Sequence, residues 1–517
     1  MTQGRGSPTT RTITLNAVEK HSAAGRGGAS RALPSMPRPG AVCAALLCAC
    51  SFPSTPTLLP PPFGPDVLHP DAARFFFPTG VVIDPSGSWV VVSNANADRL
   101  YDAGAMYSFR AADILALSGN VPFPSKARVG AVITGNFTGP MVLAGDASTG
   151  SPPLTAYTAS RDTNLLNSVA LDSATGLLSC RGRAASSGPP DCRAGSVDLN
   201  NATALDGTVA EVEGPFGVAA GAVRLPGASS DTQVVMVTSL VPRIEDIQNG
   251  LPITSSHVVA LDQADPARIL FSATVTNRFT ANNVAGGPMV FDDRSREAIV
   301  SGCFSRFASA SAGGELSTLK CGTITTTQNL LRFVPMNAGS SAVSRLYDLG
   351  PQIHSTDTTG LALGSVDATT GLRRLYLVTR FPDTFARVSI PADPAFGPVL
   401  ELVTTISSLP SQIFLIRRPA GNTGPDLLAV TAVATFETST SAGKLLLIDG
   451  FQGTVVGQVD EIGDTPFFVA QFPPAAGDAN ANLVVTQFGS CGLTLIDVPY
   501  DNPALAGVRA RIGSCPQ

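Results

Sequence analysis

Charged residues are scarce in this sequence, and lysine occurs only four times. Charged residues make up 14% of the 517 residues, against roughly 25% in an ordinary soluble domain. Six of the 34 basic residues but only one of the 39 acidic residues precede Cys50, so the remainder of the chain is acidic. No part of it gathers the Lys and Arg that displace counterions from a phosphate backbone, which argues against nucleic-acid binding.

Motifs of several catalytic classes are also missing. The sequence has no Gly-x-Ser-x-Gly turn, no glycine-rich phosphate loop and no Cys-x-x-Cys pair. These absences argue against a serine hydrolase, a nucleotide-binding enzyme and a zinc site. After Cys50 the histidines are His69 in a proline-rich stretch, His257 in an expected strand and His354 beside a turn. We interpret His257 as a strand residue whose ring points to solvent or to a neighbouring sheet, rather than as a catalytic base.

The N-terminal region has the features of an export signal. From Met36 the chain reads MPRPGAVCAALLCAC, with one basic residue, Arg38, then an apolar run over 41–49, then Cys50. A basic start followed by about 7–15 apolar residues that end in small ones is typical of a signal peptide. The sequence therefore predicts a signal peptide over 36–49, preceded at 1–35 by a leader that is non-native or disordered.

The residues Leu47-Cys48-Ala49-Cys50 resemble the bacterial lipobox, in which the last cysteine becomes the lipid-bearing N-terminus. The resemblance implies lipidation at Cys50, although Cys48 stands where Ala or Ser is usual. Ser51 then implies an outer-membrane lipoprotein that meets the membrane through its lipid alone; the alternative is a secreted or periplasmic protein. Residues 50–70 are rich in proline and are expected to form a semi-extended tether to a folded body over 71–517.

Six cysteines follow Cys50. An even number of cysteines in an exported chain indicates disulfides. Six cysteines allow 15 connectivities, and proximity in the sequence favours three local pairs. These are Cys180 with Cys192, Cys303 with Cys321, and Cys491 with Cys515.

Three sequence signals recur seven times in the same order. The first is a turn residue followed by an apolar run, at 78–87, 139–150, 215–227, 287–296, 358–371, 410–424 and 465–477. The second is a β-branched strand that ends in a hydroxyl residue: Ser93, Thr158, Thr238, Ser301, Thr379, Thr431 and Thr486. The third is another strand, often closing on Asp: AMYSF, NSVALD, HVVALD, ELSTLKC, FARVSI, KLLLID and GLTLID. Each repeat therefore predicts at least three strands joined by turns and a variable loop.

The repeats predict a ring of sheets. One small sheet cannot bury both of its faces, but seven sheets packed around an axis can. We therefore expect an all-β fold, a seven-bladed β-propeller with four-stranded antiparallel blades, over 71–517. The length of the repeat varies mostly between the second and third strands, which places the longer loops at one rim. Trp89, the only tryptophan, is expected to pack between blades.

The residue patterns of these signals resemble those of the YVTN-type bacterial β-propellers, which repeat a Pro-Gly strand, an Asp-x-x-Gly turn, a "lyVt" strand and a closing "viD" strand. The segments that carry the resemblance are Pro78-Thr79-Gly80, Asp84-Pro85-Ser86-Gly87, Val91-Val92-Ser93-Asn94, Leu446-Leu447-Ile448-Asp449 and Leu495-Ile496-Asp497. It covers about residues 75–515 and implies the architecture rather than a particular activity.

Polar residues before several first strands could meet at the central channel. They are Glu213, Asn282, Asp357 and Asp464. Because Ca²⁺ takes oxygen ligands, such a ring could hold a divalent ion. This is the basis of one alternative function, a divalent-metal-dependent lactonase or hydrolase with its site at the channel. Polar residues are also ordinary at turns.

Four arginines follow the second strands closely: Arg161, Arg243, Arg306 and Arg380. They either form a rim for an anionic ligand or are ordinary solvated side chains. Since no catalytic constellation is found, the sequence favours a non-catalytic binding or scaffolding protein of the bacterial envelope. The expected partner is another envelope protein or a polysaccharide, and the expected state is a monomer without a cofactor.

Overall fold

The computed structural model divides the chain into two compact units, Met1–Thr57 and Leu58–Gln517. The described residues all belong to the second unit. They are 60–63, 73–145, 153–181, 189–239, 243–248, 251–280, 284–303, 329–353, 357–380, 382–406, 409–433 and 443–515. The predicted leader, the signal peptide and the lipidation site Cys50 therefore lie outside the described residues.

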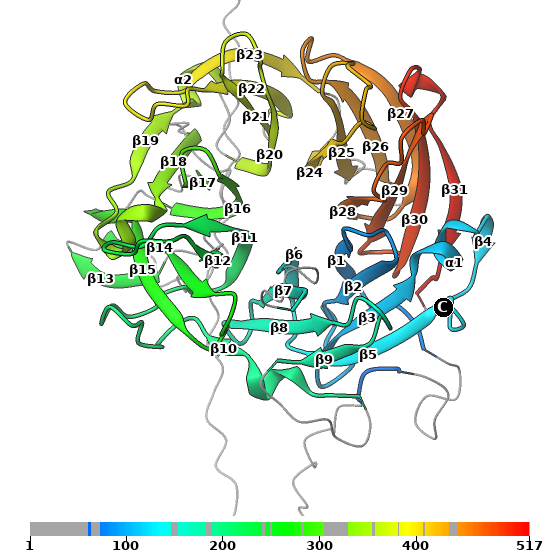
Figure 1. The fold of residues 1–517 in the computed structure, drawn as a ribbon, viewed down its shortest axis with the longest axis horizontal. Coiled ribbons are helices and arrows are strands. Elements are labelled where there is room, and N and C mark those ends of the chain that lie inside the picture. The colour runs from blue at the N-terminus through cyan, green and yellow to red at the C-terminus, as the bar shows by residue number, and fades with distance from the viewer. Residues whose placement is uncertain are drawn as a thin grey trace, which may run out of the picture. The chain divides into compact units, whose positions relative to one another are not determined.

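Seven antiparallel sheets, each formed by consecutive parts of the chain, make a ring in the second unit (Figure 1). The fold is a seven-bladed β-propeller, as the sequence predicts. Blade 1 contains β1 (Pro78–Ile83), β2 (Trp89–Asn94), β3 (Gly104–Arg110) and β5 (Arg128–Thr134). Blade 2 contains β6 (Thr138–Ala144), β7 (Thr155–Ser160), β8 (Leu165–Leu171), β9 (Leu178–Cys180) and β10 (Val197–Asp198).

Blade 3 is extended by an additional strand. It contains β11 (Pro215–Val223), β12 (Thr232–Ser239), β13 (Arg243–Gln248), β14 (Leu251–Asp262) and β15 (Ile269–Thr280). Blade 4 contains β16 (Val284–Asp292), β17 (Glu297–Cys303), β18 (Asn329–Pro335) and β19 (Arg345–Asp348). Blade 5 contains β20 (Asp357–Val366), β21 (Arg373–Arg380), β22 (Thr384–Ile390) and β23 (Val399–Thr405).

The last two blades follow the same pattern. Blade 6 contains β24 (Leu409–Ile416), β25 (Leu427–Val433), β26 (Gly443–Asp449) and β27 (Val455–Gly463). Blade 7 contains β28 (Pro466–Gln471), β29 (Asn480–Gln487), β30 (Gly492–Pro499) and β31 (Gly507–Ile512), joined by β4 (Gly119–Val121). The α-helices are α1 (Ala111–Leu115) and α2 (Gly350–Ile353). Within the described part of the chain, no helix is long and apolar enough to cross a membrane.

Alternation along the strands explains why the blades pack in a ring. Successive side chains of a strand point to opposite faces of its sheet. In β2, Val90 and Val92 join the apolar cluster shared with blade 7, whereas Trp89 and Val91 join the cluster shared with blade 2. One such cluster fills each of the seven seams between neighbouring blades. The indole Nε1 of Trp89 also donates to the carbonyl of Ser173 in blade 2 (2.8 Å), which confirms that Trp89 packs between blades.

The predicted strands are found in nearly every repeat. All seven first and second strands are confirmed, and so are six of the third strands. In the fourth repeat the prediction is wrong, because the third strand, which pairs with β17, is β18, Asn329–Pro335. The ELSTLKC segment predicted for this place, 315–321, lies outside the described residues. The fourth strands gave no distinct signal because they are less buried; β23 alternates between exposed and half-buried residues along its whole length.

At the closure of the ring, the four main strands of blade 1 and the four of blade 7 each come from one continuous part of the chain. In addition, β4, which lies between β3 and β5 in the sequence, adds to the outer edge of blade 7 in parallel with β31. Arg509 of β31 donates to the carbonyl of Leu115 at the end of α1 (3.1 Å). Within the predicted tether, the carbonyl of Pro62 accepts a hydrogen bond from Tyr107 Oη (3.0 Å), and the Phe63 ring contacts the Tyr107 ring, so this part of the segment packs against blade 1.

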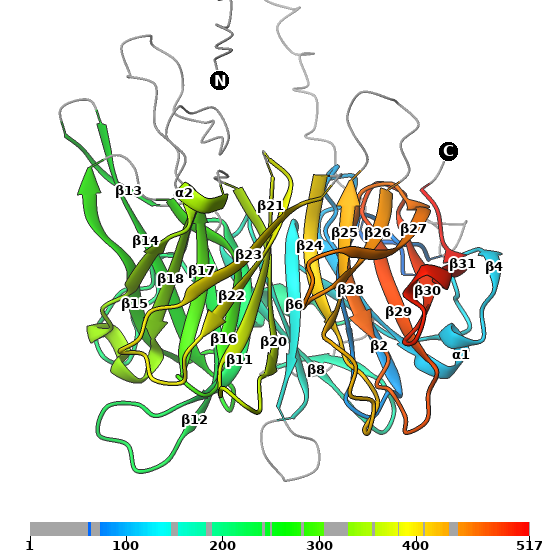
Figure 2. The same cartoon turned by 90° about the horizontal axis from the view of Figure 1, so that it is seen from above.

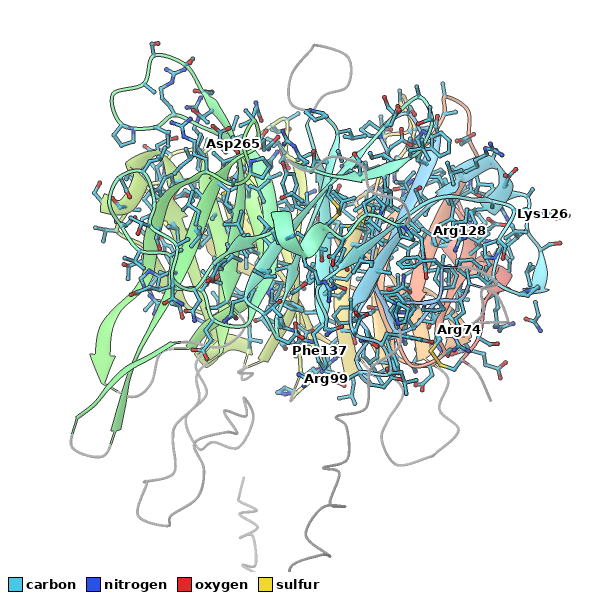
Figure 3. The ribbon with its side chains drawn as sticks, turned by 90° about the horizontal axis from the view of Figure 1, so that it is seen from below. Arg74, Arg99, Lys126, Arg128, Phe137 and Asp265 are labelled. Atoms are coloured by element: carbon cyan, nitrogen blue, oxygen red, sulfur yellow. A yellow bond between two sulfur atoms is a disulfide. The ribbon has the colours of Figure 1, made fainter. Side chains whose placement is uncertain are left out.

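The two faces of the propeller carry different connections. We call upper the face where second strands pass to third strands and where one blade passes to the next. Figure 2 shows the tip of β13 projecting on this face. Arg99 and Phe137 also lie on the upper face, with the guanidinium 5.2 Å from the ring centroid, whereas Asp265 lies on the opposite, lower face (Figure 3). The upper face is therefore the one on which the sequence places its longer loops.

Candidate functional site

Seven buried hydroxyl groups surround the upper end of the central channel. They belong to the residues that close the second strands: Ser93, Thr158, Thr238, Ser301, Thr379, Thr431 and Thr486. Each lies opposite or beside an irregularity in the register of the first strand of its blade. A bulge leaves backbone groups without ladder partners, and a short hydroxyl side chain can reach them.

The hydrogen bonds of these hydroxyl groups show what they do. Ser93 Oγ accepts from the backbone N–H of Gly80 (3.0 Å) within blade 1. Thr486 Oγ1 accepts from Phe468 N (2.9 Å) in its own blade and donates to the carbonyl of Thr79 (3.2 Å) in blade 1. Thr431 likewise bridges blades 6 and 7. Thr431 and Thr486 thus join neighbouring blades. The hydroxyl groups of Thr158 and Ser301 bond to first strands of their own blades, and Thr238 Oγ1 has no hydrogen-bond partner.

The central channel below these hydroxyl groups is lined mostly by apolar residues, with Gln412 and Arg417 also in its wall. A cavity of about 300 Å³ is lined by first-strand residues of six blades, among them Met141, Met289 and Ile413. At its upper end Phe216 of blade 3 reaches Phe467 of blade 7, with ring centroids 6.4 Å apart. Because blades 3 and 7 stand on opposite sides of the ring, this aromatic pair narrows the mouth of the channel.

The side chains of two of the four predicted metal ligands are described, and neither of these lines the channel. Glu213 and Asp464 are exposed, Asp357 begins β20, and Asn282 lies outside the described residues. No group of three or more His, Cys, Asp or Glu suited to a metal ion occurs in the described ranges. Divalent ions prefer oxygen ligands, so the described residues give the lactonase alternative no support, and the metal site stays a prediction.

Of the four arginines of the predicted rim, Arg161 and Arg380 have described side-chain contacts. The Arg161 guanidinium lies over the Phe216 ring, 5.8 Å from its centroid, and burial lowers the pKa of Arg161. Arg380 donates from Nε to the carbonyl of Pro410 (2.7 Å) and so fastens blade 5 to blade 6. Arg243 begins β13, and Arg306 lies outside the described residues. Both described guanidinium groups thus have packing partners, and the anion-binding rim stays a prediction.

Sequence reasoning missed a Ser–His–Glu chain in blade 3. Ser272 Oγ lies 3.4 Å from His257 Nδ1, and His257 Nε2 lies 3.2 Å from Glu211 Oε2. The order Ser–His–acid is that of a catalytic triad, but the two ring nitrogens are exchanged, since a triad serine bonds to Nε2 and the carboxylate to Nδ1. Ser272 is only 5% exposed, however, and its backbone N–H donates to Thr208 in the segment that covers it. A nucleophile must meet its substrate, so we assign this chain a structural role; no local motif pointed to it because its members come from separate segments.

Two of the three predicted disulfides are present, Cys180–Cys192 and Cys491–Cys515. The first lies in blade 2, and the second ties the end of the chain to the turn before β30. Cys321, the predicted partner of Cys303, lies outside the described residues. Two of the local pairs that proximity in the sequence favours are therefore confirmed, and the pair of Cys303 with Cys321 stays a prediction.

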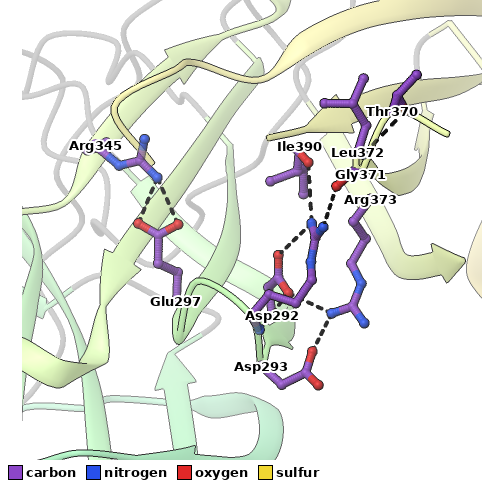
Figure 4. A network of polar contacts seen from close by, with 10 residues as sticks. Asp292, Asp293, Glu297, Arg345, Thr370, Gly371, Leu372, Arg373 and Ile390 are labelled. Carbon is purple, nitrogen blue, oxygen red and sulfur yellow. Dashed lines mark hydrogen bonds and ion pairs between the residues drawn. The ribbon is translucent and has the colours of Figure 1, made fainter. Parts of the chain in front are cut away.

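A buried ion-pair network joins blades 4 and 5 on the lower face (Figure 4). Asp292 is fully buried at the end of β16 and accepts from Arg373 Nη1 of blade 5 (2.6 Å). Arg294 lies 3.5 Å from the same carboxylate and donates to the carbonyls of Gly371 (2.7 Å) and Ile390 (3.3 Å). These ion pairs balance the Asp292 charge within the protein, although Asp292 Oδ2 and the Nε atoms of Arg294 and Arg373 make no hydrogen bond in the structure.

Comparisons with known proteins show similarity of fold only. No family model matches the sequence, and no curated protein sequence matches it. A dihydro-heme d1 dehydrogenase structure is 10% identical, with a TM-score of 0.39 over 84% of this chain and 63% of that one, so this chain spans less than two thirds of its length. The Dos1 propeller is 10% identical, with a TM-score of 0.39 over 82% of this chain and 81% of that one.

A third solved structure has a different activity again. It is an oligogalacturonate lyase in complex with manganese, 10% identical, with a TM-score of 0.34 over 80% of this chain and 85% of that one. The names of these proteins differ in function, and the similarities are too distant to transfer any of them. The function of this chain has to be argued from its own residues.

Proposed function

We propose that this propeller is an exported, lipid-anchored binding or scaffolding protein of the bacterial envelope, and that it docks another envelope protein on its upper face. The observation that carries the proposal is the extension of blade 3. β14 and β15 are each 12 residues long, yet β12 pairs only with the second half of β14, Val258–Asp262. The first half of β14 pairs with β13 and with the end of β15, beyond the blade.

β13 is the edge strand of this extension. Among the described strands it pairs with β14 alone, so its outer backbone groups face away from the sheet. An edge strand that projects from a rigid scaffold can accept a strand of another protein through main-chain hydrogen bonds. A scaffold whose seven seams are all filled by apolar clusters holds such an extension in a fixed place.

Two further observations support export and binding. Disulfides persist in oxidising compartments, and the propeller has two of them among its described residues. The lipobox-like segment that ends at Cys50 supports a lipid anchor. The mostly apolar lining of the channel offers few of the oxygen ligands that a divalent ion takes, which supports binding rather than metal-dependent hydrolysis.

The docking proposal is tested by removing the extension. Replacing residues 240–256 with Asn-Gly joins Ser239 to His257 through a two-residue hairpin and keeps the pairing of β12 with β14. We expect crosslinking of the protein in intact envelopes to lose its partner band. A matched control replaces the exposed residues 226–230, between β11 and β12 on the lower face, with Asn-Gly and keeps the band. An unchanged crosslinking pattern in the first variant would rule out upper-face docking.

The anchor is tested separately. Growth with labelled palmitate is expected to label the wild-type protein and not the Cys50→Ser variant. A mature protein whose intact mass shows no lipid would contradict the anchor while leaving the docking proposal open to its own test.

A further inference from the structure

A second cavity lies at the seam between blades 6 and 7. Its volume is about 420 Å³, within the range of roughly 300–1,000 Å³ that is usual for small-molecule sites. Its walls come from the end of β27, from β29, β30 and β31, and from β4, the strand that blade 1 contributes to the edge of blade 7. The cavity is therefore completed only when the ring is closed.

Gln487 at the end of β29 borders this cavity and has no hydrogen-bond partner. The residue is 2% exposed, and neither its amide nitrogen nor its amide oxygen has a partner in the structure. Most buried side-chain polar atoms in native proteins are hydrogen-bonded, and leaving one unpaired costs about 1–3 kcal/mol. A carboxamide that is unpaired at both ends is thus an expensive feature for which the fold itself gives no reason.

Glycines keep the space in front of Gln487 open. Gly463 has φ +120°, and a Cβ at this position would lie 2.7 Å from Gln487 Oε1. Gly492 stands opposite Gln487 in the register of β29 and β30, so no side chain covers the amide from that strand. A Cβ at Gly492 would instead meet the backbone carbonyl of Ile512 at 2.7 Å, so both positions are too close to their neighbours for a side chain.

Arg511 supplies a positive charge to the same cavity. Its Nε (3.2 Å) and Nη2 (2.7 Å) both donate to the backbone carbonyl of Glu461, and among the described residues no carboxylate pairs with it. Thr494 Oγ1 is already used, since it donates to the carbonyl of Ile462 (2.6 Å). Asp464 is exposed beside the cavity, where its backbone N–H donates to Ser490 Oγ. One cationic group and one unpaired amide therefore remain for a ligand.

We propose that this cavity is a binding site for a small carboxylate that carries hydroxyl groups. A guanidinium donates charge-assisted hydrogen bonds to a carboxylate. A carboxamide offers two N–H donors and a carbonyl acceptor, which match hydroxyl groups that can both accept and donate. Asp464 near the mouth repels a second carboxylate, so the ligand has one acidic group and directs it to Arg511. The site is independent of the docking surface proposed on blade 3.

Three probes of similar length separate the parts of this proposal. Isothermal titration of the full mature chain is done with gluconate, which has both chemical groups, with sorbitol, which lacks the carboxylate, and with hexanoate, which lacks the hydroxyls. Gluconate is expected to bind at least about ten-fold more tightly than either of the others, as the loss of a hydrogen bond to a charged group implies. Equal binding of gluconate and sorbitol, or no binding of any probe, overturns the proposal.

Two variants and a control assign the binding to the residues. Gln487→Leu and Arg511→Met are each expected to weaken gluconate binding at least about ten-fold. The control Arg417→Met removes an exposed arginine outside the cavity and leaves binding unchanged. Without ligand, Gln487→Leu is expected to melt at the same temperature as the wild type or higher, because it removes an unpaired buried amide. A lower melting temperature, or gluconate binding kept in both variants, overturns the proposal.

Discussion

The seam between blades 4 and 5 and the seam between blades 6 and 7 differ in how their buried polar groups are paired. In the first, the buried carboxylate of Asp292 has arginines on both sides, and the arginines also satisfy backbone carbonyls. In the second, the buried amide of Gln487 has no partner, and Arg511 rests on a backbone carbonyl. Apolar clusters fill both seams, so the difference lies in the polar groups around them.

This difference separates structure from function within one repeated architecture. A polar group whose partners are all within the protein contributes to stability, whereas one without a partner costs stability. The lower-face network between blades 4 and 5 is therefore expected to be sensitive to mutation in its stability. The cavity between blades 6 and 7 is expected to be sensitive in its binding.

The largest effect is expected for Arg373→Met at the seam between blades 4 and 5. The substitution leaves the fully buried Asp292 carboxylate without its shortest ion pair, and removing one partner of a buried pair costs about 3–5 kcal/mol. Urea denaturation should show this loss in the free energy of unfolding. Arg224→Met breaks an exposed pair with Asp231 and should cost less than about 1 kcal/mol. Equal effects of the two substitutions would contradict the contrast between the seams.

The pKa of Asp293 belongs to the same network. Burial raises it, but the hydrogen bond and charge of Arg373 outweigh the burial and hold the pKa of Asp293 below its usual range. A carboxylate of this kind stabilises the fold above its unfolded pKa, and the stabilisation is lost as the pH falls through the folded pKa. The Arg373→Met variant should therefore lose part of the acid sensitivity of the wild type in the same denaturation series.

A smaller effect on stability is expected from the disulfide beside the cavity between blades 6 and 7. Cys491–Cys515 closes a separation of 24 residues and flanks the cavity of blade 7. Replacing both cysteines with serine should lower the free energy of unfolding by about 3 kcal/mol, since the unfolded chain regains its loop entropy. Reduction of the wild-type protein should move its denaturation midpoint in the same direction. A double variant as stable as the oxidised wild type would show that the bond does not constrain the fold.

The smallest effect is expected at Thr486 and Thr431, whose hydroxyl groups each bridge two neighbouring blades. Thr486→Val removes a hydroxyl that accepts from Phe468 and donates to Thr79, and should cost about 1–2 kcal/mol. Thr431→Val at the next seam should cost the same, and Thr423→Val at an exposed position should cost almost nothing. Thermal unfolding of the three variants tests this order. Unequal effects of Thr486→Val and Thr431→Val would contradict an equal contribution of the two hydroxyl groups to stability.

Much of the fold could be predicted because its signals are local. The first, second and most third strands have apolar runs bounded by turn residues, and β2 shows why: Val90 and Val91 are both apolar because both faces of the strand meet a neighbouring blade. The candidate sites could not be predicted in this way. Arg161, chosen for its place after a strand, turned out to stack on Phe216, while Gln487 carried no motif at all.

The sequence by itself determined the number of repeats, their strand order and the closing hydroxyl residues, because each of these depends on neighbours within a few residues. Only the tertiary structure decided that β18 rather than an earlier segment completes blade 4, that β4 joins blade 7, and that Asp292 finds Arg373. The bond between Thr486 and Thr79 joins residues 407 positions apart. Contacts of that kind depend on closure of the ring, which cannot be predicted from a local pattern of residues.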